Sequence, residues 1–227
     1  MGTPQNTNNL AIYDMDKTLT KAPTYTAFLM HVAIRRAPWR FLLLPFVGLS
    51  LLAYALKLID RARLKEWNHW LLIGPKLPQA KLEPLVRSFA ERTMRSNIRP
   101  GTRAALEKDR ADGRVLIMAT ASYHFYAAAI GEKLGFDHVI GTNSVLGLDA
   151  KVHAKIDGEN CYGPAKLHMI EAWLLENNVA PGHVRFYSDH HSDQPAFDWS
   201  DEPVAVHPDA KLLALAKERG WRIEDWG

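Results

Sequence analysis

The sequence has 227 residues, of which 47% are hydrophobic and 23% are charged. This composition excludes an intrinsically disordered chain, and the length predicts one large domain or a core with a sizeable insertion. A net charge of +3 is too small to indicate a nucleic-acid partner. The single cysteine, Cys161, excludes an internal disulfide framework and favours a reducing compartment. Because the polar opening MGTPQNTNNL lacks the basic and apolar regions of a secretory signal, we expect a cytoplasmic protein.

Apolar runs alternate with amphipathic stretches over much of the chain. The first run, residues 10–13, predicts a buried strand that ends in the polar turn DMDKTLT. Residues 22–96 contain helical stretches broken by prolines and predict an inserted, all-helical cap. Further helices are predicted at 102–111, 123–134, 166–176 and 209–219, and further strands at 115–119, 138–141, 184–187 and 204–206. This alternation predicts an α/β fold with a doubly wound parallel sheet.

Polar side chains follow three of these predicted strands. They are Asp14 and Asp16 after the first strand, Thr120 and Ser122 after the strand at 115–119, and Asp189 and Asp193 after the strand at 184–187. Ligands of such sheets bind at the carboxyl ends of the strands, so we expect these groups to converge. Carboxylates about 4 Å apart repel by about 4 kcal/mol at an effective dielectric of about 20, so the cluster calls for a hard divalent cation, Mg²⁺.

The same segments resemble the motifs of the haloacid dehalogenase (HAD) superfamily. DMDKTLT matches its DxDxT pattern, VLIMATAS its strand ending in Ser or Thr, NCYGPAKLHMIEAWL its lysine segment, and FYSDHHSD its GDxxxD pattern. The resemblance is to the phosphatase subgroup that includes phosphoserine phosphatase and carries a helical cap after the first motif. It implies a Rossmann-like catalytic core of residues 1–21 and 97–227 and a helical cap of residues 22–96.

The resemblance also implies a Mg²⁺-dependent phosphomonoester hydrolase that works through an aspartyl phosphate. Asp14 would be the nucleophile, and Asp16 would protonate the leaving oxygen and then deprotonate the attacking water. Thr120 and Lys166 would hold the phosphoryl oxygens. The residues expected to contact the substrate are Thr18, Ser122 and His190. The Mg²⁺ ligands would be Asp14, the main-chain carbonyl of Asp16, and Asp189, with Asp193 fixing the waters of the ion.

Two positions depart from the subgroup. Ser188 stands where the fourth motif usually has glycine, and a glycine-specific backbone angle would strain it. Pro23 stands nine residues after Asp14, where phosphoserine phosphatases have a glutamate for the substrate amine. Phosphoserine is therefore not favoured as the substrate.

Residues Phe41–Leu56 form an uncharged apolar stretch of sixteen residues. It is preceded by Arg35, Arg36 and Arg40 and followed by Lys57, Arg61, Arg63 and Lys65. Three interpretations are open. The stretch packs inside the cap, or it lies on the inner face of the membrane with its basic flanks on anionic lipid, or it spans the bilayer, for which it falls short of the roughly 17 to 25 residues needed.

The leading hypothesis is a phosphomonoesterase of small molecules. The alternative is a lipid phosphatase at the membrane surface, because the apolar, basic cap resembles that of bacterial phosphatidylglycerophosphate phosphatases of the same subgroup. A third hypothesis is a non-catalytic protein that binds phosphate or a partner. The expected partner is a small-molecule or lipid phosphomonoester and not a nucleic acid, while the oligomeric state stays open.

Overall fold

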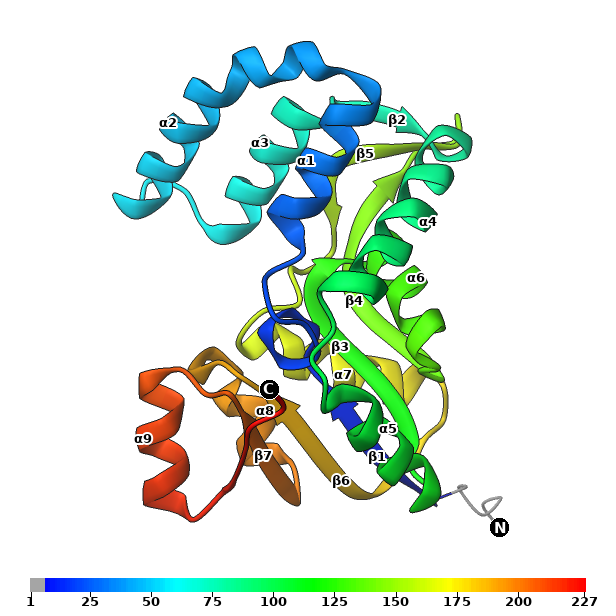
Figure 1. Cartoon of the computed structure of the whole chain (residues 1–227), viewed down its shortest axis with the longest axis vertical. Coiled ribbons are helices and arrows are strands. Elements are labelled where there is room, and N and C mark those ends of the chain that lie inside the picture. The colour runs from blue at the N-terminus through cyan, green and yellow to red at the C-terminus, as the bar shows by residue number, and fades with distance from the viewer. Residues whose placement is uncertain (1–6) are drawn as a thin grey trace.

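The computed structural model of the protein describes residues 7–227 (Figure 1). Residues 1–6 of the polar opening lie outside the described residues. The strands are β1 (Thr7–Tyr13), β2 (Lys76–Pro78), β3 (Val115–Tyr123), β4 (His138–Leu146), β5 (Lys151–Asp157), β6 (Ala180–Ser188), β7 (Glu202–Val206) and β8 (Arg222–Glu224). The α-helices are α1 (Tyr25–Arg36), α2 (Leu44–Ala55), α3 (Arg61–Leu72), α4 (Gln79–Ser96), α5 (Thr102–Ala111), α6 (His124–Leu134), α7 (Pro164–Glu176), α8 (Gln194–Trp199) and α9 (Ala210–Arg219). Short helices are η1 (Met15–Leu19), η2 (Pro38–Leu43) and η3 (His191–Asp193).

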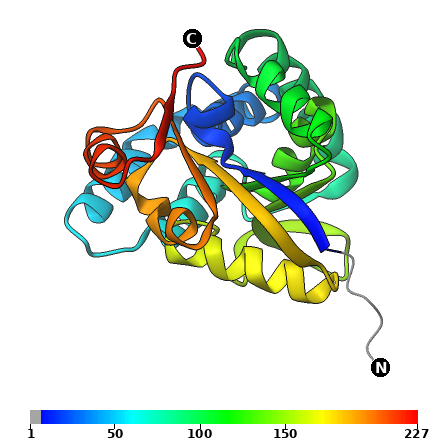
Figure 2. The same cartoon turned by 90° about the horizontal axis from the view of Figure 1, so that it is seen from below.

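The strands form one eight-stranded sheet in the order β2-β5-β4-β3-β1-β6-β7-β8. The pairings from β4 to β8 are parallel, whereas β5 runs antiparallel to both β4 and β2. Helices cover both faces of the parallel part, as the view from below shows (Figure 2). The predicted α/β fold with a mainly parallel sheet is confirmed.

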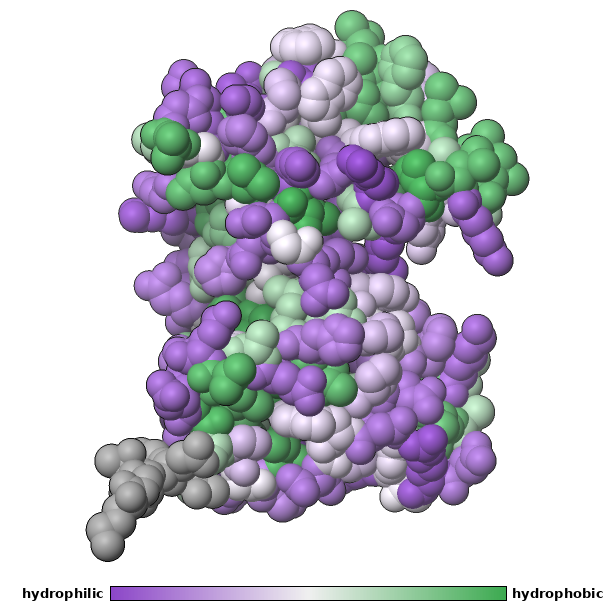
Figure 3. Space-filling model, turned by 180° about the vertical axis from the view of Figure 1, so that it is seen from behind, coloured by the Kyte–Doolittle hydropathy of each residue, from purple (hydrophilic) through white to green (hydrophobic). Residues whose placement is uncertain are grey.

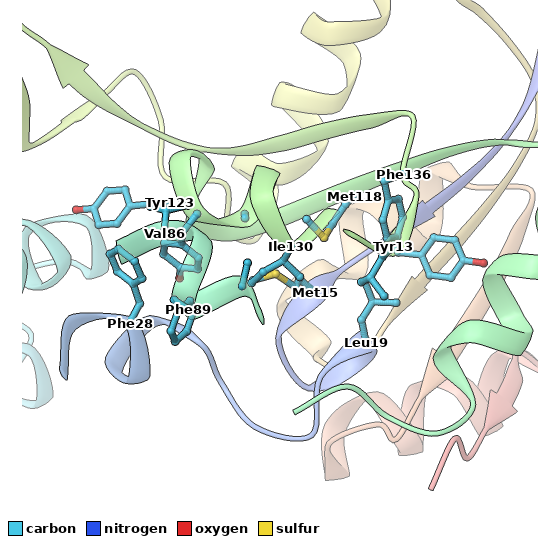
Figure 4. Close-up of a cluster of buried hydrophobic side chains, with 14 of the residues drawn as sticks. Tyr13, Met15, Leu19, Phe28, Val86, Phe89, Met118, Tyr123, Ile130 and Phe136 are labelled. Atoms are coloured by element: carbon cyan, nitrogen blue, oxygen red, sulfur yellow. The ribbon is translucent and has the colours of Figure 1, made fainter. Parts of the chain in front are cut away.

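The central strands alternate between two hydrophobic clusters, as expected of strands that are buried on both faces. In β1, Ala11 and Tyr13 belong to the cluster under α5 and α6, whereas Leu10 and Ile12 belong to the cluster under α7, α8 and α9. The first cluster continues into the inserted segment, where Phe28 of α1 joins it (Figure 4). The insertion therefore shares its core with the sheet.

The insertion after η1 contains one strand besides its helices. Strand β2 pairs antiparallel with β5, and β5 itself was not predicted. The prediction of an all-helical cap is therefore incomplete. The β4–β5 hairpin has a free strand edge, and β2 of the insertion pairs with that edge and buries Leu77 there. Helix α4 also packs on helix α6 of the core. The division into a core of 1–21 and 97–227 and a cap of 22–96 stays a prediction.

Helix α2 is the most exposed apolar element of the insertion. Ser50 is its only buried residue, and the segment Pro38–Ala55 has a mean hydropathy of 1.4 with only 6% of it buried. By length and composition this segment could cross a membrane. The interpretation that residues 41–56 pack inside the cap is wrong, because Ser50 is the buried residue of α2 and most of its other side chains are exposed.

Candidate active site

Strands β1, β3 and β6 end beside one another and bring the predicted site residues together. A cavity of about 300 Å³ opens at these strand ends, between the core and the first part of the insertion. The predicted residues that line it are Asp14, Asp16, Thr120, Lys166, Asp189, His190 and Asp193. Thr18 and Ser122 lie directly behind the carboxylates, and both are buried.

Lys166 lies between two carboxylates at the floor of the cavity. Its Nζ is 2.8 Å from Asp14 Oδ1 and 2.5 Å from Asp193 Oδ2. The first turn of α7 carries it there, directly after Gly163, whose φ of 60° makes the turn into the helix. Burial opposes the charge of Lys166, but Asp14 and Asp193 outweigh it and hold the lysine pKa above its ordinary value. The lysine is therefore a fixed positive charge at the nucleophile.

Asp14 and Asp189 are linked through a buried hydroxyl. Thr18 Oγ1 lies 3.2 Å from Asp14 Oδ2 and 3.4 Å from Asp189 Oδ1. The backbone N–H of Asp14 donates to Tyr187 O at 2.8 Å and so fixes the residue at the strand end. Burial raises the pKa of Asp14 to about 6, with Lys166 opposing, and burial together with the charge of Asp14 raises the pKa of Asp189 to about 8.

Asp16 is held in place through both of its carboxylate oxygens. Oδ1 accepts the backbone N–H of Thr24 at 2.6 Å, and Oδ2 accepts the Ser122 hydroxyl at 2.7 Å. Tyr126 donates to that same hydroxyl oxygen at 2.6 Å. The turn that carries Asp16 is tight, because Lys17 has a φ of 65°. Asp16 is thus presented to the cavity in one orientation.

Ser188 and His190 lie on the β6 side of the cavity. Ser188 is not among the residues with positive φ, so the backbone strain that its replacement of glycine suggested does not arise. Its hydroxyl donates to Asp193 Oδ2 at 2.6 Å instead. His190 lines the cavity, and burial lowers the pKa of its imidazole although Asp209 opposes this.

The insertion supplies lining residues that sequence reasoning did not identify as part of the site. Tyr25, Thr26 and Arg61 line the cavity, together with Tyr162 of the core. The Arg61 guanidinium stacks on the Tyr162 ring at 4.0 Å. Arg61 was noted only as part of a basic flank, since nothing in the local pattern indicates that α3 begins at the mouth of the site.

The carboxylates of this site fit a hard divalent cation. Asp14 and Asp189 share one hydroxyl partner, and burial raises the pKa of both although Lys166 opposes this. Oxygen donors of this kind favour Mg²⁺. A second set of donors, His190, His191 and Asp209, lies within 4.8 Å of one another, but His191 and Asp209 already bond each other at 2.6 Å.

The comparisons with known proteins agree on one family. The family model described as haloacid dehalogenase-like hydrolase matches residues 11–198. Phosphoserine phosphatase SerB1 of Mycobacterium tuberculosis is 29% identical over 147 residues, which are 65% of this chain and 47% of that protein. A histidinol-phosphatase of Neisseria meningitidis is 28% identical over 140 residues, which are 60% of this chain and 63% of that protein. The chain thus spans about half to three fifths of the length of these relatives.

Solved structures show the same fold. A protein of unknown function from Bordetella pertussis has a TM-score of 0.88 at 22% identity, covering 98% of this chain and all of that one. A substrate-bound phosphoserine phosphatase has a TM-score of 0.63 at 16% identity, covering 96% of this chain and 93% of that one. At these identities the likeness concerns the fold alone.

Proposed function

We propose that this chain, which belongs to the haloacid dehalogenase-like hydrolase family, hydrolyses phosphomonoesters through an aspartyl phosphate on Asp14. The observation that carries the proposal is the bridge of Lys166 between Asp14 and Asp193 beside the doubly held carboxylate of Asp16. It supplies an immobile nucleophile, a positive charge for the phosphoryl oxygens and a separate acid. Phosphoryl transfer needs mainly such positioning and charge stabilisation.

The two steps divide the work between the two aspartates. In the first step Asp14 attacks phosphorus, the bond to the leaving oxygen breaks, and Asp16 gives that oxygen a proton. In the second step Asp16 takes a proton from water, the water oxygen attacks phosphorus, and the bond to Asp14 breaks. Lys166 and Thr120 hold the phosphoryl oxygens in both steps. Substrate contacts by Thr18, Ser122 and His190 are part of the proposal.

We include Mg²⁺ as the cofactor, which Asp14, Asp189 and the main-chain carbonyl of Asp16 would hold, while Asp193 would fix its waters. When bound, such an ion neutralises charge on the transferred phosphoryl group. The carboxylates of Asp14 and Asp189 support this assignment, because burial leaves both with raised pKa values.

The names of the relatives point to small-molecule esters, since those described above are a phosphoserine and a histidinol-phosphate phosphatase. The residues that line the cavity do not support phosphoserine as the substrate. Pro23 lines it where the resemblance would place a glutamate, and no glutamate is among the described residues that line it. A second candidate, a lipid phosphatase acting at the inner face of the membrane, is favoured by the exposed apolar surface of α2.

The test is phosphate release with Mg²⁺ and with EDTA, comparing wild type with Asp14→Asn and with the surface variant Asp149→Asn. We expect turnover only with Mg²⁺, loss of at least about a thousandfold in Asp14→Asn, and no change in Asp149→Asn. Borohydride reduction during turnover should convert Asp14, and no other aspartate, to homoserine. Full activity in Asp14→Asn would overturn the proposal. Absence of any metal-dependent release would favour a non-catalytic phosphate-binding protein.

A further inference from the structure

Exposed apolar side chains gather on one part of the insertion (Figure 3). On η2, α2 and the turn that follows, the large hydrophobic residues that are more than one third exposed are Trp39, Leu42, Leu44, Phe46, Leu49, Leu51, Leu52, Tyr54, Leu56 and Leu58. Trp67 and Trp70 of α3 are also exposed beside them. We call this set the α2 face. Contiguous exposed apolar surface of this kind on a water-soluble fold marks a binding surface.

The charges around the α2 face are mainly positive. The sequence has no aspartate or glutamate from Lys17 to Ile59, and cations stand at both ends of the apolar stretch. These cations are Arg35, Arg36, Arg40, Lys57, Arg61 and Arg63. The nearby acidic residues are Asp60, which accepts the backbone N–H of Arg63, and Glu66, which pairs with the Arg63 side chain. Two copies of the chain meeting face to face would therefore bring mainly cations together. An anionic lipid surface complements both the apolar and the basic parts.

The geometry favours lying on the bilayer over crossing it. Of the apolar segment Pro38–Ala55, residues Pro38–Leu43 form the short helix η2, and α2 has 12 residues and is therefore about 18 Å long, against about 30 Å for a hydrocarbon core. It is tied to α3 by a buried hydrogen bond of 2.7 Å from Ser50 Oγ to Asn68 Oδ1. Arg40 binds the carbonyls of Trp70 and Leu71 at 3.0 and 2.7 Å and holds the preceding turn in the same way. Spanning would break these contacts.

A second cavity lies beside the active-site cavity, under the α2 face. It has a volume of about 250 Å³ and lies under the C-terminal half of α2, where Leu51 and Tyr54 line it opposite Asp16. The two cavities have Asp16, Tyr25, Arg61 and Ala121 in common. Most of the second cavity is apolar, so it suits a hydrocarbon group attached next to the phosphate.

Arg61 lies where the apolar cavity approaches the protein surface. It lines the active-site cavity, the apolar cavity and a surface hollow at the turn between α2 and α3, which Tyr54 and Leu58 also line. A group that extends from Asp16 along the apolar cavity would therefore reach the surface beside the exposed side chain of Leu58. The exit lies within the α2 face.

We infer that the α2 face seats the cap on an anionic lipid bilayer, and that the cavity lined by Leu51 and Tyr54 takes the apolar chain of a phosphomonoester from that bilayer. The second half rests on the proposed function, because it needs Asp14 and Asp16 to act on the phosphate. The first half does not depend on catalysis.

The docking test uses the full chain and sedimentation with vesicles of phosphatidylcholine, alone or with about one third phosphatidylglycerol. We expect binding to the anionic vesicles that salt weakens, and at least about tenfold weaker binding of Leu42→Glu/Leu52→Glu. The matched control is Leu148→Glu/Leu175→Glu, which places the same two charges on exposed leucines of the core. Equal binding of both double variants, or no binding of wild type at low salt, would overturn the docking. So would a dimer in solution that the first double variant dissociates, without vesicle binding.

The substrate test compares octyl phosphate with ethyl phosphate below the micellar concentration. We expect kcat/KM to favour the octyl ester at least about tenfold in wild type, and Leu51→Gln to reduce that preference. A preference near one in wild type would overturn the assignment of the apolar cavity. Asp14→Asn should bind anionic vesicles like wild type. Vesicle binding without turnover of any ester would refute the proposed function alone, whereas turnover without vesicle binding would refute the docking alone.

Discussion

Ser122 Oγ lies 2.7 Å from Asp16 Oδ2 and donates a hydrogen bond to the carboxylate that we propose as the general acid. The other oxygen of Asp16 is held by the backbone of Thr24, at the start of the insertion. One partner of Asp16 thus comes from the core and the other from the segment that leads into α1. Ser122 itself is 1% exposed. Its hydroxyl is therefore placed to orient Asp16, and the predicted contact with substrate stays a prediction.

Replacement of Ser122 by alanine should lower kcat by about tenfold, because Asp16 loses one of the two bonds that fix its orientation. KM should change little, since Lys166 and Thr120 are untouched. The loss should be larger for an alkyl phosphate than for p-nitrophenyl phosphate, whose leaving oxygen needs no proton. Steady-state kinetics with both esters measures this difference.

The control for Ser122→Ala is Ser96→Ala, which removes an exposed hydroxyl at the end of α4. Its kinetics should match wild type. Equal losses for the two leaving groups in Ser122→Ala would show that the hydroxyl acts on the phosphate and not through Asp16.

Affinity for Mg²⁺ should rise as the pH is raised from 6 to 8. In the metal-free protein the pKa of Asp14 is about 6 and that of Asp189 about 8, so at pH 6 Asp189 is protonated and Asp14 is about half protonated. A metal ion must displace those protons, and each proton released strengthens binding by up to about tenfold per pH unit. Calorimetric titration at three pH values measures the slope.

Asp189→Asn should weaken Mg²⁺ binding at least about tenfold, because a charged ligand is lost. It should also make the affinity less dependent on pH, because the asparagine has no titrating proton for the metal to displace. Asp149→Asn, an exposed change of the same kind, should leave both unchanged. An affinity that does not vary with pH in wild type would contradict the ligand roles of Asp14 and Asp189.

The parallel part of the fold was predictable because each central strand is a short apolar run followed at once by a polar turn. The helix 102–111 was predicted with the bounds that α5 has. Strand β5 was missed although its residues alternate between polar and apolar, the pattern of a half-buried strand, and it follows β4 across a short turn. Strand β2 could not be found in this way, since it has three residues and pairs with β5, which is distant in sequence.

The candidate site was predictable for the same reason as the central strands. Asp14 and Asp189 follow β1 and β6, and Thr120 lies near the end of β3, and a parallel sheet must bring these strand ends together. The contribution of the insertion was not predictable, because the place of Arg61 depends on how α3 packs over the core. The exposure of α2 could not be predicted either, because an apolar helix has the same sequence pattern whether protein or lipid covers it.

Asp109 should be the most important carboxylate for stability outside the site. It is fully buried on α5, where it bonds Arg185 and Tyr13 and accepts the Tyr187 hydroxyl at 3.0 Å. Asp109→Asn should lower the free energy of unfolding by about 3 kcal/mol, because it removes the buried charge that binds Arg185 and leaves this guanidinium with Glu202, at 2.7 Å, as its close carboxylate. Asp112→Asn is the matched control, since Asp112 is 3.7 Å from Arg185 but half exposed, and it should cost less than about 0.5 kcal/mol. Urea unfolding of both variants tests the difference, and similar losses would contradict it.

Lys65 should give the protein a stability that increases above neutral pH. Its Nζ donates to Ala121 O at 2.6 Å and to Asn160 Oδ1 at 2.8 Å, which joins α3 to the core, and burial lowers its pKa to about 7. The unfolded chain keeps the lysine proton up to its ordinary pKa of about 10.4, whereas the folded protein releases it near 7. Between these values the unfolded state binds more protons, so the free energy of unfolding rises with pH by up to about 1.4 kcal/mol per unit. Urea unfolding at pH 7, 8 and 9 should show this slope in wild type and in the exposed control Lys57→Met, and a smaller slope in Lys65→Met. Equal slopes in all three proteins would mean that Lys65 stays protonated in the folded state and that its ammonium, not its amine, joins the cap to the core.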